Sequence, residues 1–135
     1  MKKTFSGAIL AGGMSRRMGF NKAFIEIDGL SIIERTSRTM AAVFSSPAII
    51  ANDTTLYSHL GLPVYPDVIK DAGSLGGIYT ALFQSKEEYA FVTACDMPWL
   101  DQRCVRRGLD NVEGGDCAIP FISGRLHPMH AAWSK

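Results

Sequence analysis

The amino-acid sequence predicts an α/β protein with three layers, α/β/α, around a mainly parallel, Rossmann-like sheet. Short apolar segments at residues 5–10, 47–51 and 89–93 alternate with segments of helical character. Polar residues stand just beyond the ends of several of these predicted strands, and open α/β sheets bind ligands at that place. A chain of 135 residues can bury the core of one domain, so we expect a single domain over residues 1–135.

The first part of the chain contains a strand, a short extended piece and a helix. Residues Phe5 to Leu10 form the first predicted strand, and Phe24 to Ile27 form an extended piece that the turn pair Asp28-Gly29 closes. Ser31 and Glu34 have the spacing of a capping box, which predicts the start of a helix. The helix is expected to reach about Phe44, with a largely apolar face made of Ile32, Ile33, Thr36, Met40, Val43 and Phe44.

Three more strands are expected further along. Residues 47–51 form a buried candidate that ends at Asn52, and Val64-Tyr65 forms another that ends near Asp67. Residues 89–93 form the next strand, which ends at Cys95-Asp96. A glycine cluster at 73–78 is expected between a strand and a following helix.

Composition excludes several classes of protein. The formal net charge is +1, so a broad nucleic-acid-binding face is not expected. The three cysteines lack C-x-x-C spacing, which argues against a disulfide framework and a zinc site and favours a reducing cytoplasm. The basic, partly apolar N-terminus imitates a secretory signal, but Ser6 and Gly7 interrupt its apolar run. No apolar run approaches the roughly 20 residues that cross a bilayer, so no membrane partner is expected.

The loop that follows the first strand is rich in glycine and positive charge. Gly12 and Gly13 let the backbone turn sharply and present N–H groups to phosphate oxygens. Arg16, Arg17 and Lys22 add three cations, a mixture that suits a polyanion such as a nucleotide. The spacing fits neither the Walker pattern nor the dinucleotide fingerprint. The alternative is a surface turn whose arginines are merely solvated.

The stretch Leu10-Ala-Gly-Gly-Met-Ser-Arg-Arg-Met-Gly resembles the signature of the molybdenum cofactor guanylyltransferases, the MobA family. These enzymes are nucleotidyltransferases with a glycosyltransferase-A-like fold, also described as nucleotide-diphospho-sugar transferase-like. The resemblance implies that Leu10, Ala11, Gly12, Gly13 and Lys22 contact the nucleotide. It also implies that Arg16, Arg17 and Lys22 offset charge on the leaving pyrophosphate.

Asp96 is the candidate metal ligand. It follows an apolar strand in Ala-Cys-Asp-Met-Pro98, and magnesium is commonly held by one or two carboxylates together with substrate phosphates. The alternative is a turn or helix cap. Cys-Asp-x-Pro after a strand resembles the family's magnesium-binding motif, which implies that Asp96 is a catalytic residue that binds Mg²⁺.

The resemblance implies further nucleotide contacts. The cluster that begins at Gly73 is similar to a family motif that lies against the nucleoside. Asn52 and Asp67 correspond to positions that contact the guanine nucleoside and the triphosphate or metal region, although Asp53 competes with Asn52 for its assignment. Without the resemblance, Asn52 and Asp67 would be taken as ordinary turn formers.

Arg125 and the run His127-Pro-Met-His130 suggest a second part of the site. A proline between the histidines favours an extended segment with the two side chains on opposite faces, which makes a metal site the less favoured interpretation. The run resembles a late strand of the family near the pterin substrate, which places it at the rim of the acceptor site. Trp99 and Trp133 are expected to be core or rim aromatics.

The implied activity is transfer of GMP from GTP to Mo-molybdopterin, which yields the molybdopterin guanine dinucleotide cofactor and pyrophosphate. Cofactor-insertion proteins or acceptor molybdoenzymes are the implied protein partners. Transfer of CMP to the same pterin, transfer of a nucleotide to a sugar phosphate, and a GTP-binding module without catalysis remain alternatives.

The sequence departs from the family pattern at three places. Asn21 stands where the family has aspartate, and Ser74 stands where it has proline. The family domain also continues beyond the position of Lys135, so we expect its C-terminal part to be absent from these 135 residues.

Overall fold

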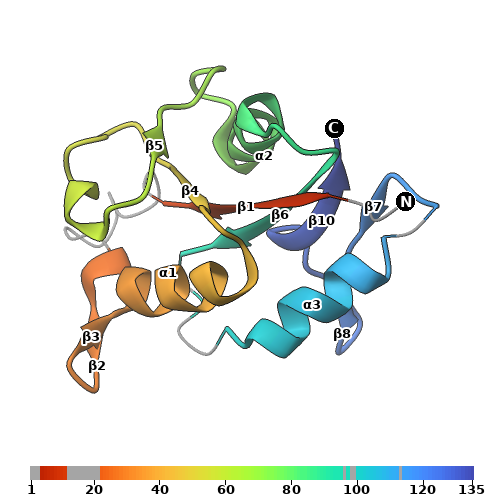
Figure 1. Ribbon diagram of the computed structural model, residues 1–135, viewed down its shortest axis with the longest axis horizontal. Coiled ribbons are helices and arrows are strands. Elements are labelled where there is room, and N and C mark those ends of the chain that lie inside the picture. Colours follow the sequence, from red (N-terminus) through yellow and green to blue (C-terminus); the bar gives the residue numbers. More distant parts are fainter. Residues whose placement is uncertain (1–3, 12–21, 96, 98–99, 113) are drawn as a thin grey trace.

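A six-stranded sheet runs through the centre of the protein (Figure 1). The computed structural model describes residues 4–11, 22–95, 97, 100–112 and 114–135. The first four strands in the sheet are mutually parallel, and the last two pair antiparallel. In spatial order the strands are β5 (Val64–Tyr65), β4 (Ala48–Ile50), β1 (Phe5–Leu10), β6 (Tyr89–Ala94), β10 (His130–Ser134) and β7 (Cys117–Ala118).

Helices cover both faces of this sheet, which confirms the predicted three-layer α/β/α architecture. In Figure 1, α1 (Ile32–Val43) and α3 (Gln102–Asp110) lie on one face, and α2 (Gly73–Gln84) lies on the other. One apolar cluster lies between α1 and the sheet, and we call it the cluster below α1. A second lies between α2 and the sheet, and we call it the cluster below α2. Within the described ranges, no helix is both long and apolar enough to cross a membrane.

The register of β1 against β6 explains how side chains of the same two strands pack in both clusters. Gly7 pairs with Phe91 and Ala8 pairs with Val92. Because successive side chains of a strand point to opposite faces, Phe91 packs in the cluster below α1, whereas Ala8 and Val92 pack in the cluster below α2. Both strands are buried on both faces, which accounts for their continuous apolar sequences.

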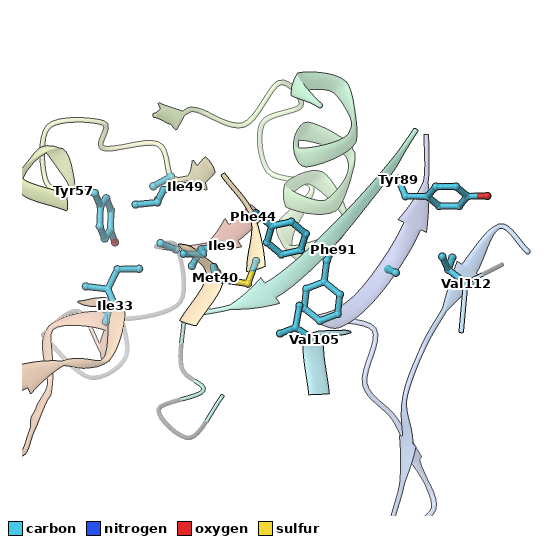
Figure 2. Packing of buried hydrophobic residues seen from close by; sticks show 14 residues of the cluster. Ile9, Ile33, Met40, Phe44, Ile49, Tyr57, Tyr89, Phe91, Val105 and Val112 are labelled. Atoms are coloured by element: carbon cyan, nitrogen blue, oxygen red, sulfur yellow. The ribbon is translucent and has the colours of Figure 1, made fainter. Parts of the chain in front are cut away.

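Phe44 and Phe91 form the centre of the cluster below α1 (Figure 2). Their rings stack with centroids 6.5 Å apart. A Cβ atom on Gly7 would lie 2.4 Å from Cδ2 of Phe44, closer than any real contact. Glycine at this position of β1 therefore makes room for the aromatic ring that ends α1.

Helix α1 begins where the capping box predicts. The Ser31 Oγ accepts a hydrogen bond from the Glu34 N–H at 3.3 Å, and the Ser31 N–H donates to Glu34 Oε2 at 2.9 Å. The Ser31 N–H and, at 3.1 Å, the Ser31 hydroxyl both donate to the Glu34 carboxylate and lower the pKa of that carboxyl, because they favour its charged form. The helix ends at Val43, within one residue of the prediction.

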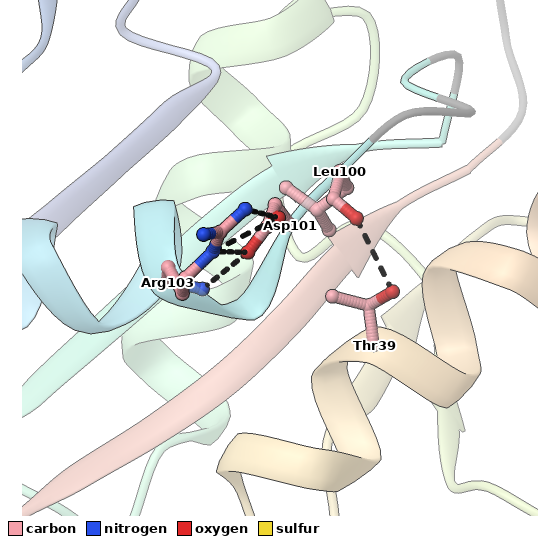
Figure 3. A network of polar contacts seen from close by, with 4 residues as sticks. All are labelled: Thr39, Leu100, Asp101 and Arg103. Carbon is pink, nitrogen blue, oxygen red and sulfur yellow. Dashed lines mark hydrogen bonds and ion pairs between the residues drawn. The ribbon is translucent and has the colours of Figure 1, made fainter.

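Helix α3 is an element that the sequence analysis did not predict. The Asp101 side chain caps it by accepting from the Arg103 N–H at 2.7 Å, and the same carboxylate pairs with the Arg103 guanidinium (Figure 3). Thr39 Oγ1 donates to the Leu100 carbonyl oxygen at 3.4 Å, which links α1 to the start of α3. Its apolar face is narrow, because only Val105 and Leu109 point into the cluster and most of the other residues of the helix are polar or charged.

The predicted extended piece at 24–27 is partly wrong. Phe24 ends a short 3-10 turn, η1 (Lys22–Phe24), and its ring stacks on that of Tyr57 with the centroids 5.5 Å apart. The turn pair Asp28-Gly29 is confirmed, with φ angles of 53° and 84°. It joins β2 (Glu26–Ile27) to β3 (Leu30–Ser31). Remaining short elements are η2 (Ser58–Leu60) and the hairpin of β8 (Phe121–Ile122) and β9 (Arg125–Leu126).

Candidate functional site at the carboxyl edge of the sheet

Strands β1, β4, β5 and β6 end at the same edge of the sheet, which we call the carboxyl edge. The Ala11 N–H donates to the Ile50 carbonyl at 2.9 Å, and the Ala51 N–H donates to the Tyr65 carbonyl at 2.9 Å. The Cys95 N–H donates to the Leu10 carbonyl at 3.0 Å. The chain therefore leaves all four strands from one edge, as expected for ligand binding by a parallel sheet.

Several predicted site residues lie outside the described residues. These are Gly12, Gly13, Arg16, Arg17 and Asp96, together with Trp99. Lys22 is described only as the first residue of η1. The expected roles of these residues stay predictions. Leu10 and Ala11 are described, and they lie at the carboxyl edge directly before Gly12.

Asn52 and Asp67 contact each other at the carboxyl edge. Asn52 Nδ2 donates to Asp67 Oδ2 at 3.2 Å, and the Asp67 N–H donates to Asn52 Oδ1 at 2.9 Å. Lys70 Nζ donates to the same Asn52 oxygen at 3.1 Å. Reversing the amide would set its NH₂ group against two donors, so these three hydrogen bonds fix its orientation. Sequence reasoning missed Lys70, which lies in the loop between β5 and α2.

Asp53 competes with Asn52 in the sequence but has a different role in the structure. Its Oδ1 accepts from Thr55 Oγ1 at 2.8 Å and from the Leu56 N–H at 3.3 Å. This is the pattern of an aspartate that stabilises its own turn. The geometry therefore favours Asn52 as the residue that belongs to the site.

The loop that carries Asp67 and Lys70 is attached to α2. The Val68 N–H donates to Thr80 Oγ1 at 2.9 Å, and that hydroxyl donates to the Gly76 carbonyl at 2.8 Å. Thr80 is fully buried. Asn52 after β4 thus holds Asp67, and Thr80 in α2 holds the next residue, Val68.

The glycine cluster at 73–78, expected between a strand and a following helix, is itself the first half of α2. Gly73 has φ +59°, a conformation that favours glycine, and begins the helix without a side-chain cap at Ala72. A Cβ on Gly77 would lie 3.2 Å from Leu10 Cδ1. The small residue therefore permits close packing of α2 on β1, a structural reason that sequence reasoning did not give.

The His127–His130 segment is a tight turn, not the predicted extended piece. The His130 N–H donates to the His127 carbonyl at 3.1 Å, a turn in which Pro128 occupies the first central position, where proline is favoured. The Ala94 N–H donates to the Met129 carbonyl at 2.9 Å, which attaches the turn to the end of β6. A hollow of about 280 Å³ lies here, lined by Ala94, Met97, Leu126, His127, Pro128, Met129 and His130.

The two histidines of this turn differ in environment. His127 is exposed, whereas His130 is buried and its ring meets Phe91 edge-on at 5.0 Å. Its Nδ1 lies 3.4 Å from Thr93 Oγ1. Burial, and to a smaller degree the charge of His127, lower the pKa of His130, so its imidazole is neutral near pH 7.

Arg125 lies on the exposed hairpin strand β9 nearby. Trp133, half-buried on β10, packs with the cluster below α2, as predicted for a core or rim aromatic.

The chemistry of the described carboxyl edge suits a hard divalent cation only in part. Among the described residues, no three histidine, cysteine, aspartate or glutamate side chains are arranged to hold a metal ion. Asp67 supplies a carboxylate, and magnesium needs only one or two carboxylates when substrate phosphates complete its shell. The described edge therefore offers one carboxylate, which would hold such a metal only together with phosphate oxygens.

Comparison with known proteins identifies the family. The profile described as "MobA-like NTP transferase domain" matches residues 7–135. This chain belongs to the MobA-like NTP transferase family. A Pelotomaculum thermopropionicum protein named "Probable molybdenum cofactor guanylyltransferase" is 38% identical over 130 residues, which cover 96% of this chain and 63% of that protein. The Desulfosudis oleivorans "Molybdenum cofactor guanylyltransferase" is 36% identical over 132 residues, or 96% of this chain and 65% of that protein.

Solved structures support the MobA-like fold. An Aquifex aeolicus protein superposes with a TM-score of 0.77 at 34% identity, covering 96% of this chain and 69% of that chain. "Molybdopterin-guanine dinucleotide biosynthesis protein A" from Archaeoglobus fulgidus superposes with a TM-score of 0.78 at 22% identity, covering 96% of this chain and 67% of that one. The second likeness concerns the fold alone. In length, this chain spans somewhat under two thirds of the two curated relatives named in the preceding paragraph.

Proposed function

We propose that this MobA-like chain transfers GMP from GTP to Mo-molybdopterin and releases pyrophosphate. The observation that carries the proposal is the fixed Asn52–Asp67 pair at the carboxyl edge, beside the strand that leads into the Leu10-Ala-Gly-Gly stretch. Relatives named for this activity match 96% of the chain. GTP and Mo-molybdopterin are accordingly the proposed substrates.

The nucleotide is proposed to bind across the carboxyl edge. Leu10 to Gly13, Asn52, Asp67 and Gly73 would contact the nucleoside and phosphates, and Arg16, Arg17 and Lys22 would offset the charge of the leaving pyrophosphate. Mg²⁺ is proposed to bind Asp96 and the phosphates. When bound, it would neutralise charge that develops on the transferring phosphoryl group. The chain's own residues then catalyse by positioning the substrates and by charge complementarity.

The acceptor is proposed to bind at the hollow beside the His127–His130 turn. This hollow adjoins the end of β6, and its lining combines apolar side chains with two imidazoles, which suits a planar heterocycle. The acceptor's terminal phosphate oxygen would bond to the α-phosphorus of GTP as the bond to the β-phosphate oxygen breaks. Cofactor-insertion proteins or molybdoenzymes are proposed to receive the product. A cytoplasmic location is proposed because the three cysteines of the sequence lack the spacing of a disulfide framework.

The test is magnesium-dependent pyrophosphate release from GTP in the presence of Mo-molybdopterin, with CTP compared in parallel. Asp96→Ala should reduce release by roughly 10²–10³-fold, whereas Asp110→Ala, an exposed change on α3, should leave it unchanged. Release with CTP instead of GTP would assign the chain to CMP transfer. GTP binding without release would assign it as a binding module.

A further inference from the structure

Lys70 is a cation at the carboxyl edge that the proposed function has not used. It lies in the loop between β5 and α2 and is exposed. Its Nζ contacts a neutral atom, Asn52 Oδ1, at 3.1 Å. The two ion pairs found among the described residues join Arg35 to Asp28 and Arg103 to Asp101. Within the described part of the chain, therefore, no carboxylate lies within ion-pair distance of the Lys70 ammonium.

The position of Lys70 is set by the groups around it. Asn52 Oδ1 faces Lys70 because its amide is fixed by both the side chain and the backbone of Asp67. The loop backbone is held by the hydrogen bond from Val68 to the buried hydroxyl of Thr80. An ammonium group has three donors, and the contact with Asn52 uses one. Two N–H groups thus remain for an anion.

The location of this cation determines which ligand it can meet. Asn52 follows β4, whose Ile50 carbonyl accepts the N–H of Ala11, and Ala11 directly precedes Gly12. Lys70 therefore stands on the same edge as the stretch proposed to bind phosphates, but it comes from a different loop. Its charge would add to those of Arg16, Arg17 and Lys22, and it comes from the loop after β5, the strand that neighbours β4 in the sheet.

We propose that Lys70, oriented by Asn52, is a further phosphate-binding residue for the nucleoside triphosphate. This inference rests on the proposed nucleotide site. It differs from the alternative of a solvated surface lysine by predicting selectivity for charged ligands. Guanosine lacks phosphates, so its affinity should not depend on Lys70. The affinity of tripolyphosphate should depend on Lys70 as strongly as that of GTP does.

The test compares binding of GTP, tripolyphosphate and guanosine to wild-type protein, Lys70→Gln and Lys86→Gln by titration calorimetry with Mg²⁺ present. Lys86 is a matched control, an exposed lysine just beyond the other end of α2. Lys70→Gln should bind GTP and tripolyphosphate about tenfold more weakly than the wild type, because it loses one charge-assisted hydrogen bond. Its affinity for guanosine should be unchanged. High salt should shrink the difference. Lys70→Arg should recover part of the affinity because it restores the charge.

The inference is overturned if Lys70→Gln binds GTP as the wild type does, or if it loses affinity equally for guanosine. Thermal unfolding of both variants serves as the folding control, since an exposed lysine should not change it. Failure of the wild-type protein to bind GTP would overturn the proposed nucleotide site and this inference together. Binding of GTP with the expected Lys70 effect, but without pyrophosphate release, would overturn only the transfer activity.

Discussion

The layer below α1 and the carboxyl edge of the sheet are built from opposite kinds of contact. Below α1, Phe44 stacks on Phe91 over Gly7 of β1, where a Cβ atom would overlap the Phe44 ring. At the carboxyl edge, Asn52, Asp67 and Lys70 are partly or fully exposed and are held by side-chain hydrogen bonds. The first region determines whether the chain folds. The second is expected to determine what the folded chain binds, at little cost in stability.

The largest expected effect is in the aromatic layer. Phe91→Ala should lower the free energy of unfolding by about 3–5 kcal/mol, because it removes a fully buried ring and leaves a cavity. Urea denaturation followed by circular dichroism measures this. Phe121→Ala, a change of the same type on the exposed strand β8, is the control and should be nearly neutral. Equal losses in the two variants would contradict the comparison.

A smaller loss of stability is expected when a side chain is added to the layer between α1 and the sheet. Gly7→Ala should lower the free energy of unfolding by about 1–3 kcal/mol, since the new methyl group must displace the Phe44 ring. Gly115→Ala is the matched control, because its Cβ would make ordinary contacts at 3.6 Å. A wild-type urea midpoint for Gly7→Ala would mean that the ring moves aside freely.

His130 lies between the two regions and should make stability depend on pH. The unfolded chain protonates this residue near its ordinary value of 6.5, whereas burial in the folded state lowers its pKa. As the pH falls below 6.5, the unfolded state therefore binds more protons than the folded state, and the free energy of unfolding should decrease. Stability from this source should be complete above that pH and be lost as pH drops toward the lowered value.

The measurement is the urea midpoint of wild type and His130→Gln at several pH values between about 7.5 and 5. The variant should show a flatter profile than the wild type. His127→Gln, which alters the exposed partner, should keep most of the slope. The carboxyls of Glu34 and Asp101 have lowered pKa values and should affect stability only in a more acidic range. Parallel profiles for wild type and His130→Gln would contradict the assignment.

The smallest stability effect is expected at the carboxyl edge. Asn52→Ala should change the free energy of unfolding by no more than about 0.5 kcal/mol, because the side chain is exposed. GTP binding should nevertheless weaken, since Asp67 and Lys70 both lose a partner. Calorimetry tests this, with Asp53→Ala as the neighbouring control. A large stability loss without a binding defect would reverse the comparison.

Elements with a local signature could be predicted from sequence. The capping box at Ser31 sets the start of α1, and continuous apolar runs reveal β1 and β6 because both of their faces are buried. Helix α3 was missed although Val105, Leu109 and Val112 have helical spacing, because so narrow an apolar face within a mostly charged segment is a weak signal. The glycine cluster was placed before α2 because glycine usually marks turns, whereas Gly77 serves close packing on Leu10.

The candidate site was predictable to a similar extent. The family resemblance indicated Asn52 and Asp67, which follow two predicted strands, and the structure adds that these two side chains contact each other. Their roles toward a ligand stay predictions, as do those of Arg16, Arg17 and Asp96. Lys70 could not be found, because its place beside Asn52 depends on a loop fixed by a threonine in the following helix. Such a tertiary contact leaves no periodic pattern in the sequence.

The hydrogen bond between Val68 and Thr80 has a consequence for the thermodynamics of ligand capture. A surface loop normally loses conformational entropy when a ligand orders it, and this loss weakens affinity. Here the loop is already anchored to a buried hydroxyl of α2. Its ordering entropy is thus lost during folding, when core formation offsets it, so a ligand at this loop would meet a preorganised surface.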